Sequence, residues 1–381
     1  MGSFILLIEG SFIQNISYLT YVFIVFLLVI VLFMPPVKGV SSWFQFGGFS
    51  IQPSEFAKLA TSLAFAKFLS NVNSRFQDFK TRIKAGLLVF LPAILIILQP
   101  DAGTMLVFVG FVFVLYREGL SGNFLLIGLF AVLIATVGIF LKASNSNISI
   151  SHLEISGNVF FGFVLMLSFL FSFLIIRYFV LPRFRKQKYF QLIVVALIGI
   201  SISLSVNYIY DNLFKDRHRN RFQIMFGIKE DRRGVGYNIY QALSAIGSGE
   251  GSGKGYLNGT LSNDKYKHVP EQNTDFIFCV LAEEWGFIGS FIFILLYLST
   301  MIRMIMISER QRSKFTRIYG YCITSVLFFH FMINLGMVIG LAPVIGIPLP
   351  FFSKGGSAIL AFSIMLFILL RLDAERKVVL R

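Results

Sequence analysis

Apolar segments of roughly bilayer length recur along almost the whole of this 381-residue chain. An α-helix needs about 20 consecutive apolar residues to cross the hydrocarbon core of a membrane, and it satisfies its own backbone hydrogen bonds there. The segments that meet or approach this length are 18–34, 55–70, 85–98, 103–116, 122–141, 158–181, 190–210, 275–302, 316–342 and 355–371. Because only 14% of the residues are charged and the mean hydropathy is +0.76, a soluble domain is excluded. The sequence therefore predicts an all-α polytopic membrane protein with about ten transmembrane helices in a single domain, 1–381.

The first residues are interpreted as part of this membrane domain. Residues 2–9 look like the end of one more apolar helix, and they lack the basic region and the small-residue cleavage site of a signal peptide. The two cysteines, Cys279 and Cys322, lie in apolar segments and form no motif, so we expect both in the core.

Lysine and arginine are distributed unevenly among the predicted loops. They gather near 75–84, 183–188 and 303–317 and in the tail 371–381, whereas loops 35–54, 99–102, 142–157 and 343–354 are nearly free of them. Cytoplasmic loops carry the excess of positive charge, which places the second set of loops outside the cell. The net charge of +15 is then a signal of topology rather than of nucleic-acid binding.

One long loop, 211–273, is polar and rich in both signs of charge, and helix parity places it outside as well. Loops of this length are usually functional or disordered, and its tyrosine and aliphatic residues predict partial order at the membrane surface. Its cations could bind a pyrophosphate at headgroup depth, or could simply be attracted to anionic lipid. They are Arg217, Arg219, Arg221, Lys254, Lys265 and Lys267.

The glycine-rich run IGSGEGSGKGYLNGT (246–260) is not a nucleotide-binding loop. Ser248 stands where that motif needs its first glycine, and Gly255 stands where it needs Ser or Thr. The sequence has no His/Cys cluster with metal-ligand spacing, since His218 and His268 are isolated.

Several polar residues share the predicted outer side. Trp43 precedes a helix that carries Glu55 and Lys58, which are three residues apart and can pair on one helical face. Asp101 lies in a tight turn, where a helix cap and a functional role are equally good interpretations. The Pro- and Gly-rich loop 341–358 predicts irregular backbone surrounded by protein or water, with Lys354 near its end.

Acidic residues enter an apolar segment at PEQNTDFIFCVLAEEWGF (270–287). Asp275 is predicted in the first helical turn, where the helix dipole favours an anion, beside a loop that is rich in cations. Glu283 lies about 12 Å deeper at the rise of a helix, so we interpret it and Glu284 as paired structural supports. A functional role is favoured for Asp275.

Five stretches carry a resemblance to a known family: WFQFGGFSIQPSEFAKLA (43–60), LQPDAGT (98–104), GVGYNIYQALSAIGSGEGSGKGYLNGT (234–260), PEQNTDFIFCVLAEEWGFIGS (270–290) and NLGMVIGLAPVIGIPLPFFSKGGSA (334–358). They span most of the chain and resemble the SEDS proteins (shape, elongation, division and sporulation), in forms similar to the rod-shape branch rather than the division branch. The resemblance implies a SEDS-type bundle of about ten helices with a large extracellular loop before the antepenultimate helix. It also implies a peptidoglycan glycosyltransferase that polymerises lipid II at the outer face of the bacterial cytoplasmic membrane.

The resemblance also implies roles for single residues. Asp275 matches the essential extracellular acid of the family, thought to be the catalytic base. Trp43, Glu55, Lys58 and Asp101 match positions at the same outward cavity. The complete expected substrate-binding set is Trp43, Glu55, Lys58, Asp101, Arg219, Lys254, Lys265, Glu271, Gln272 and Lys354.

Three features depart from the family pattern. By comparison with the family pattern, we expect the sequence to lack the first helix and part of the second at its N-terminus, and segments 158–181 and 190–210 look like an added helix pair. Lys354 stands where many relatives have Tyr.

The family implies further partners: a class B penicillin-binding protein, the elongation machinery and membrane lipid. Basic side chains or a divalent cation (Mg²⁺ or Mn²⁺) would take up the leaving charge. Two other functions stay open: a lipid II flippase, whose polar sites should lie near the membrane midplane, and a non-catalytic scaffold for a transpeptidase.

Overall fold

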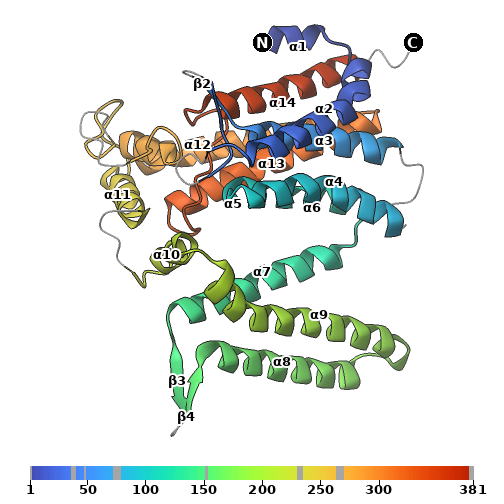
Figure 1. Cartoon of the computed structure of the whole chain (residues 1–381), viewed down its shortest axis with the longest axis vertical. Coiled ribbons are helices and arrows are strands. Elements are labelled where there is room, and N and C mark those ends of the chain that lie inside the picture. Colours follow the sequence, from blue (N-terminus) through green and yellow to red (C-terminus); the bar gives the residue numbers. More distant parts are fainter. Residues whose placement is uncertain are drawn as a thin grey trace. The chain divides into compact units, whose positions relative to one another are not determined.

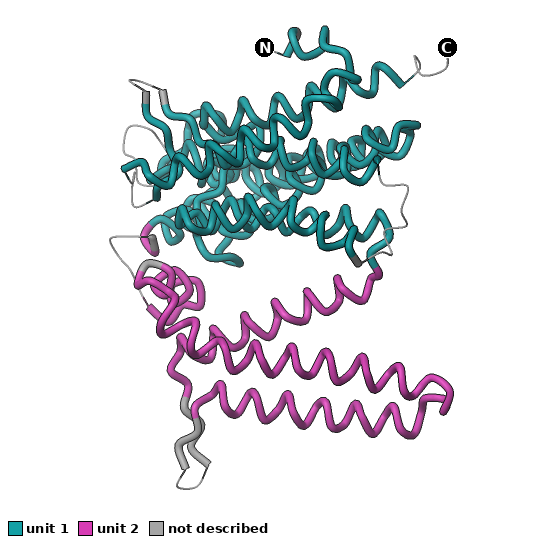
Figure 2. Tube along the Cα trace, turned by 45° about the vertical axis from the view of Figure 1, so that its right-hand side comes forward, with its two compact units in different colours: residues 1–120, 238–381 teal, residues 121–237 magenta. Residues whose placement is uncertain are grey.

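The structure is a computed structural model and describes residues 2–35, 40–46, 49–71, 79–150, 153–229, 235–262 and 270–376. Lys265, Lys267 and His268, which the sequence singled out, lie outside these residues, and the side chain of Arg217 is also not described. Contacts along the chain define two units, residues 1–120 with 238–381 and residues 121–237 (Figure 2). The assignment of residues 1–381 to a single domain stays a prediction.

All ten predicted segments are helical. They correspond to α2 (Gly10–Val31), α3 (Pro53–Asn71), α4 (Phe79–Leu98), the run α5–η1–α6 (Ala102–Val107, Phe108–Gly110, Phe111–Arg117), α7 (Gly122–Ala143), α8 (Gly157–Phe179), α9 (Pro182–Tyr208), α12 (Ile277–Glu309), α13 (Lys314–Val338) and α14 (Gly356–Ala374). Eight helices of the described chain are long and apolar enough to cross a membrane, which confirms an all-α polytopic membrane protein.

Several helix ends differ from the prediction: α4 begins at Phe79 rather than at residue 85, and α12 ends at Glu309 rather than at residue 302. The first long helix begins at Gly10 rather than at residue 18, and α9 begins at Pro182 rather than at residue 190. In both cases polar residues continue the helix beyond its apolar part, and proline is well suited to the first turn of α9. The short helix α1 (Gly2–Leu7) occupies the segment expected to be the end of another helix.

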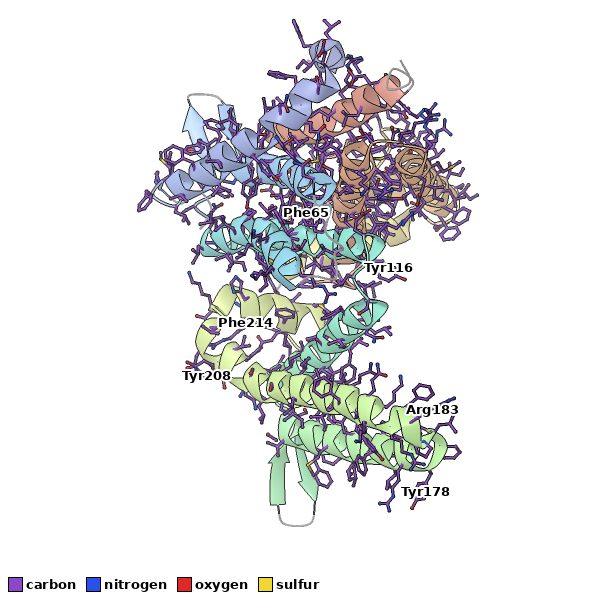
Figure 3. The ribbon with its side chains drawn as sticks, turned by 90° about the vertical axis from the view of Figure 1, so that its right-hand side faces the viewer. Phe65, Tyr116, Tyr178, Arg183, Tyr208 and Phe214 are labelled. Carbon is purple, nitrogen blue, oxygen red and sulfur yellow. The ribbon has the colours of Figure 1, made fainter. Side chains whose placement is uncertain are left out.

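Helix α13 is the centre of the larger unit, where it packs against α3, α6, α12 and α14 (Figure 1). Most of its length is buried, and Tyr297 of α12 stacks on Phe331 of α13 with ring centroids 4.4 Å apart. Phe65 of α3 (labelled in Figure 3) packs edge-on against Phe111 of α6, with ring centroids 5.6 Å apart. Buried aromatic pairs of this kind hold the helices around α13 in a fixed arrangement.

A short antiparallel hairpin, β1 (Phe44–Phe46) and β2 (Phe49–Ile51), leads into α3. Apolar periodicity did not predict it, because each strand has only three residues. The hairpin follows Trp43 and precedes Gln52, so it places the start of α3 and its charged residues at a defined position.

The smaller unit is built on α7, α8 and α9, which pack against one another. Tyr178 and Arg183 mark the turn between α8 and α9 (Figure 3), and Asn158 donates a hydrogen bond to Asn207 at 2.6 Å near their other ends. A second hairpin, β3 (Asn147–Ile150) and β4 (Leu153–Ser156), connects α7 to α8. The π-helical turn η2 (Ile209–Leu213) and helix α10 (Asp216–Met225) follow α9. Helix α11 (Val235–Ser248) comes next, so the long polar loop contains two helices.

Candidate active site

Asp275 lies in a turn that runs directly into α12. The backbone N–H groups of Thr274 and Asp275 both donate to the carbonyl of Glu271 at 3.1 Å, and Glu271 itself has a left-handed backbone with φ of 56°. The helix begins at Ile277, so the prediction that Asp275 occupies the first helical turn is wrong by two residues. Its side chain is half-buried. The backbone N–H of Asp275 is therefore hydrogen-bonded, and the residue lies just before the N-terminus of α12.

The irregular loop 341–354 packs directly against this turn. Asn334 of α13 donates from Nδ2 to the carbonyls of both Asp275 (2.8 Å) and Ile347 (2.7 Å). Ser353 donates from Oγ to the Thr274 carbonyl at 2.5 Å, and the Lys354 N–H donates to the Asn273 carbonyl at 2.7 Å. Irregular backbone of this kind needs such partners wherever lipid cannot supply hydrogen bonds.

Gly346 brings this loop to the carboxylate itself. Its φ is 73°, and a Cβ added to it would lie 3.1 Å from Oδ2 of Asp275. A residue other than glycine would be strained in this backbone conformation and would press on the carboxylate. The loop conformation and the position of Asp275 are thus linked.

Glu55 and Lys58 form a buried ion pair at the start of α3, with Nζ 2.8 Å from Oε2. Lys58 is completely buried, and its Nζ also lies 2.7 Å from Nε2 of His330 and 5.2 Å from the ring centroid of Phe362. His330 in turn contacts the Pro348 carbonyl from Nδ1 at 3.2 Å. A buried cation needs such partners to offset its lost hydration.

Asp101 caps α5 and lies close to the same loop. Its carboxylate accepts from the Thr104 N–H (3.1 Å), from the Thr104 hydroxyl (2.8 Å) and from Gln52 Nε2 (2.9 Å). A Cβ added to Gly103 would lie 2.9 Å from the Ile345 carbonyl, so α5 begins directly against the loop. Consecutive residues 345–348 therefore contact, in turn, α5, Asp275, Asn334 and His330.

Glu283 organises the glycine-rich run. It is completely buried, and its carboxylate accepts from Lys254 Nζ at 2.6 Å and from the N–H groups of Thr260 (2.8 Å), Leu261 (3.0 Å) and Ser262 (2.7 Å). The ammonium of Lys254, predicted to bind substrate, also donates to the Thr260 hydroxyl at 2.6 Å. Glu283 thus fixes the segment 254–262 against α12.

A break in α12 at Gly286 receives the same run. Gly286 has φ of 64° and ψ of −163°, so the backbone carbonyls before it lack their usual helical partners. Residues of the glycine-rich run supply donors instead: the Lys254 N–H donates to the Glu283 carbonyl (3.1 Å), and the Gly255 N–H donates to the Glu284 carbonyl (2.9 Å). A Cβ on Gly253 would lie 2.2 Å from the Glu284 carbonyl. The glycines are therefore explained by close backbone approach, without any phosphate.

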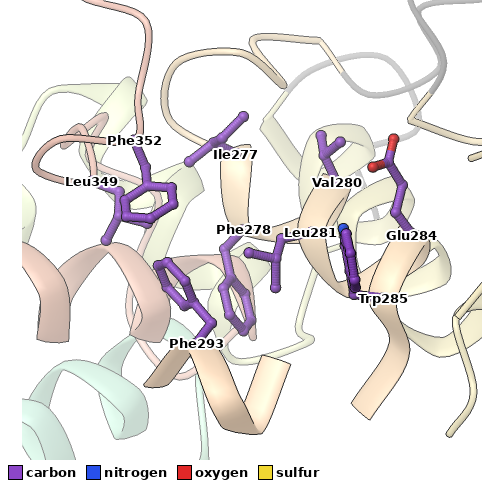
Figure 4. Close-up of a pocket in the computed structure, with 9 residues that line it drawn as sticks. All are labelled: Ile277, Phe278, Val280, Leu281, Glu284, Trp285, Phe293, Leu349 and Phe352. Carbon is purple, nitrogen blue, oxygen red and sulfur yellow. The ribbon is translucent and has the colours of Figure 1, made fainter. Parts of the chain in front are cut away.

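Glu284 lies beside an apolar pocket of about 200 Å³ along the first part of α12 (Figure 4). The pocket is also lined by Trp285, Phe293 and Phe352, and the last two rings meet edge-on at 4.6 Å. Glu284 is thus near apolar groups, whereas Glu283 is enclosed by donors.

The other predicted residues differ in exposure. Trp43 is half-buried, Gln272 is buried, and Glu271 and Lys354 are exposed. Arg219 belongs to the smaller unit, where it donates to the carbonyls of Tyr210 (2.8 Å) and Asp211 (2.5 Å).

His330 and Asn334 also belong to the site, although the sequence pattern did not predict a role for either. Polar residues within an apolar span are a general sign of function, and that signal could have identified both. Among the residues that the structure describes, no group of three or more His, Cys, Asp or Glu side chains could hold a metal ion.

Comparison with known proteins places this chain in a family. A family model for FtsW, RodA and SpoVE, described as cell cycle protein, matches residues 1–154 and 186–378. The chain belongs to this family, to which the SEDS resemblance pointed. The peptidoglycan glycosyltransferase RodA of Treponema pallidum is 32% identical over 368 residues, which are 94% of this chain and 83% of that protein. The peptidoglycan glycosyltransferase MrdB of Escherichia coli K12 is 31% identical over 361 residues, 94% of this chain and 78% of that protein.

Solved structures share the fold. A chain of a peptidoglycan synthase complex superposes with a TM-score of 0.69 at 24% identity, covering 98% of this chain and 85% of that one. The rod shape determining protein RodA of Thermus thermophilus gives 0.58 at 22% identity, covering 98% and 83%. The family match omits 155–185, which contains α8 and its turn into α9, the first half of the predicted added pair.

Proposed function

We propose that this protein is a peptidoglycan glycosyltransferase that polymerises lipid II into glycan strands at the outer face of the bacterial cytoplasmic membrane, for cell elongation and shape. The names of the relatives at 31–32% identity support this reaction. The observation that carries the proposal is the setting of Asp275, a half-buried carboxylate at a helix start whose backbone is held by Glu271 and Asn334.

Asp275 would act as the general base. Its carboxylate would accept the proton of the 4-hydroxyl of an acceptor lipid II while that oxygen attacks the anomeric carbon of the growing chain. The new glycosidic bond forms as the bond to undecaprenyl pyrophosphate breaks, and the pyrophosphate leaves with the electron pair. A positioned base contributes about 10²–10⁴-fold to such a step.

The leaving pyrophosphate needs positive charge. Lys354 is exposed, and its backbone N–H is bonded to Asn273, two residues from Asp275. We propose it as one cation at this position. A divalent cation is a further proposal: Mg²⁺ is often held by one or two carboxylates together with substrate phosphates, so it does not require a metal cluster built by the protein.

We further propose a class B penicillin-binding protein as partner, within the elongation machinery of the cell. The synthase complex whose chain shares this fold concerns polymerization and crosslinking together, which supports such a pairing. Membrane lipid is the surrounding medium, and the proposal includes no nucleic acid.

The test uses the full chain in liposomes with labelled lipid II, with and without the transpeptidase. We expect glycan strands from the wild type and a loss of at least about 100-fold for Asp275→Asn. Asp216→Asn, the same change at a side chain that is 95% exposed, is the matched control and should polymerise normally. A rate for Asp275→Asn close to that of the wild type would refute the assignment of the base. Transbilayer movement of lipid II without strands would support a flippase instead.

A further inference from the structure

His330 connects two parts of the site that are far apart in the sequence. Its imidazole is buried, with Nε2 2.7 Å from Nζ of Lys58 and Nδ1 3.2 Å from the Pro348 carbonyl. Lys58 belongs to α3 and Pro348 to the loop that packs against Asp275. The single ring therefore bridges the buried ion pair and the loop.

The partners define the state of the ring. Lys58 is paired with Glu55 at 2.8 Å and, as an ammonium, can only donate, so Nε2 of His330 accepts its hydrogen bond. The remaining proton is then on Nδ1 and is donated to the Pro348 carbonyl. This assignment gives an uncharged imidazole in one tautomer, with both nitrogens hydrogen-bonded.

The ring also acts together with Asn334. The two residues are four positions apart on α13 and thus on one helical face, and they bind the consecutive loop carbonyls 348 and 347. Asn334 binds Asp275 as well, and Gly346, the preceding loop residue, lies against the Asp275 carboxylate. Displacement of Pro348 would therefore move Gly346, which is only two residues away, relative to the Asp275 carboxylate.

We propose that His330 is a positioning residue for Asp275: it ties loop residues 346–348 to the buried Lys58–Glu55 pair, and so holds the carboxylate in its reactive geometry. This inference rests on the proposed function of Asp275 as base. It gives the ion pair on α3 a role in catalysis without contact with substrate.

Three substitutions separate the two contacts. His330→Phe removes both, His330→Asn keeps a donor near the position of Nδ1 for Pro348, and His330→Gln keeps an acceptor near the position of Nε2 for Lys58. Because a displacement of about 1 Å can cost up to about 100-fold in rate, we expect kcat of His330→Phe to fall by roughly 10- to 100-fold. KM for lipid II should stay within about twofold, since His330 positions the base and not the substrate. His330→Asn should recover more of kcat than His330→Gln.

Rates are expressed per folded molecule, with thermal unfolding measured for each variant. Thr324→Val is the matched control, because it removes another polar group of α13, whose hydroxyl bonds within its own helix at 2.8 Å, and its kcat should be unchanged. Equal kcat for His330→Phe and wild type would overturn the inference, as would a purely structural result in which stability falls but kcat per folded molecule does not. If His330→Phe does not fold, the test is the comparison of His330→Asn with His330→Gln. A kcat of His330→Gln equal to or above that of His330→Asn would overturn the inference. The proposed function fails separately, when the wild type makes no strands or Asp275→Asn remains active.

Discussion

Glu283 offers the most direct test of how a carboxylate is accommodated in α12. Its side chain is completely buried and accepts from three consecutive backbone N–H groups, those of residues 260–262, and from the Lys254 ammonium. Glu283→Ala removes all of these bonds at once. Lys254, with a side chain only 26% exposed, then loses its anionic partner.

The magnitude follows from these contacts. Removing one member of a buried pair costs about 3–5 kcal/mol, because the remaining charge is left without compensation. Three hydrogen bonds to a charged group, at about 1.5 kcal/mol each at the lower limit, give a similar sum. The loss should be local, since these bonds fix the segment 254–262 rather than the helix bundle. At about 1.4 kcal/mol per factor of ten, the amides of residues 260–262 should exchange their hydrogens roughly 10²- to 10³-fold faster.

Hydrogen exchange followed by mass spectrometry measures this directly in detergent or nanodiscs. Glu284→Ala is the matched control: it removes the adjacent carboxylate of the same helix, which lines the apolar pocket, and it should leave the exchange of residues 260–262 unchanged. Lys254→Met in both backgrounds gives the coupling energy of the pair. Protection of 260–262 in Glu283→Ala equal to the wild type would show that Glu283 does not hold this segment.

Two further substitutions test the backbone. Gly286→Ala places a Cβ 2.3 Å from the Gly253 nitrogen at a φ of 64°, so we expect the free energy of unfolding to fall by at least about 1–3 kcal/mol; an unchanged melting temperature would refute the close approach. Asp101→Ala removes the cap of α5 and should cost about 0.5–2 kcal/mol. Asp101→Asn should recover the part of this loss that belongs to the cap, because its Oδ1 can still accept from the Thr104 N–H; equal losses for the two would exclude a capping role.

The sequence predicted the helices well because the constraint is strong and local. A span needs a long apolar run, and each of the ten runs became a helix. The sequence predicted helix starts less well where polar residues continue a helix, as at Pro182. It did not predict strands β1 and β2, which are too short to show an alternating apolar pattern. The pairing of Glu55 with Lys58 followed from their spacing on one face, and the structure places them 2.8 Å apart.

The long-range part of the site could not be predicted in this way. Nothing in the spacing of Lys58 and His330, 272 residues apart, indicates that they meet. The same holds for Glu283 and the run 254–262, because the break at Gly286 frees carbonyls that only the folded chain brings to that run. The local sequence pattern identifies the polar residues. Tertiary packing decides which of them form structural hydrogen bonds and ion pairs.

That distinction separates Glu283 from Asp275. Both oxygens of Glu283 are occupied by donors of the protein, five bonds to Oε1 and one to Oε2, in a setting closed to solvent. A carboxylate bound in this way is stabilised as an anion, and taking a proton from a substrate would require these donors to move. Asp275 is half-buried rather than enclosed: its N–H and its carbonyl are hydrogen-bonded, and Gly346 lies against its carboxylate. A general base needs a fixed position and access to the substrate proton, and for that reason we propose the chemistry for Asp275 and a structural role for Glu283.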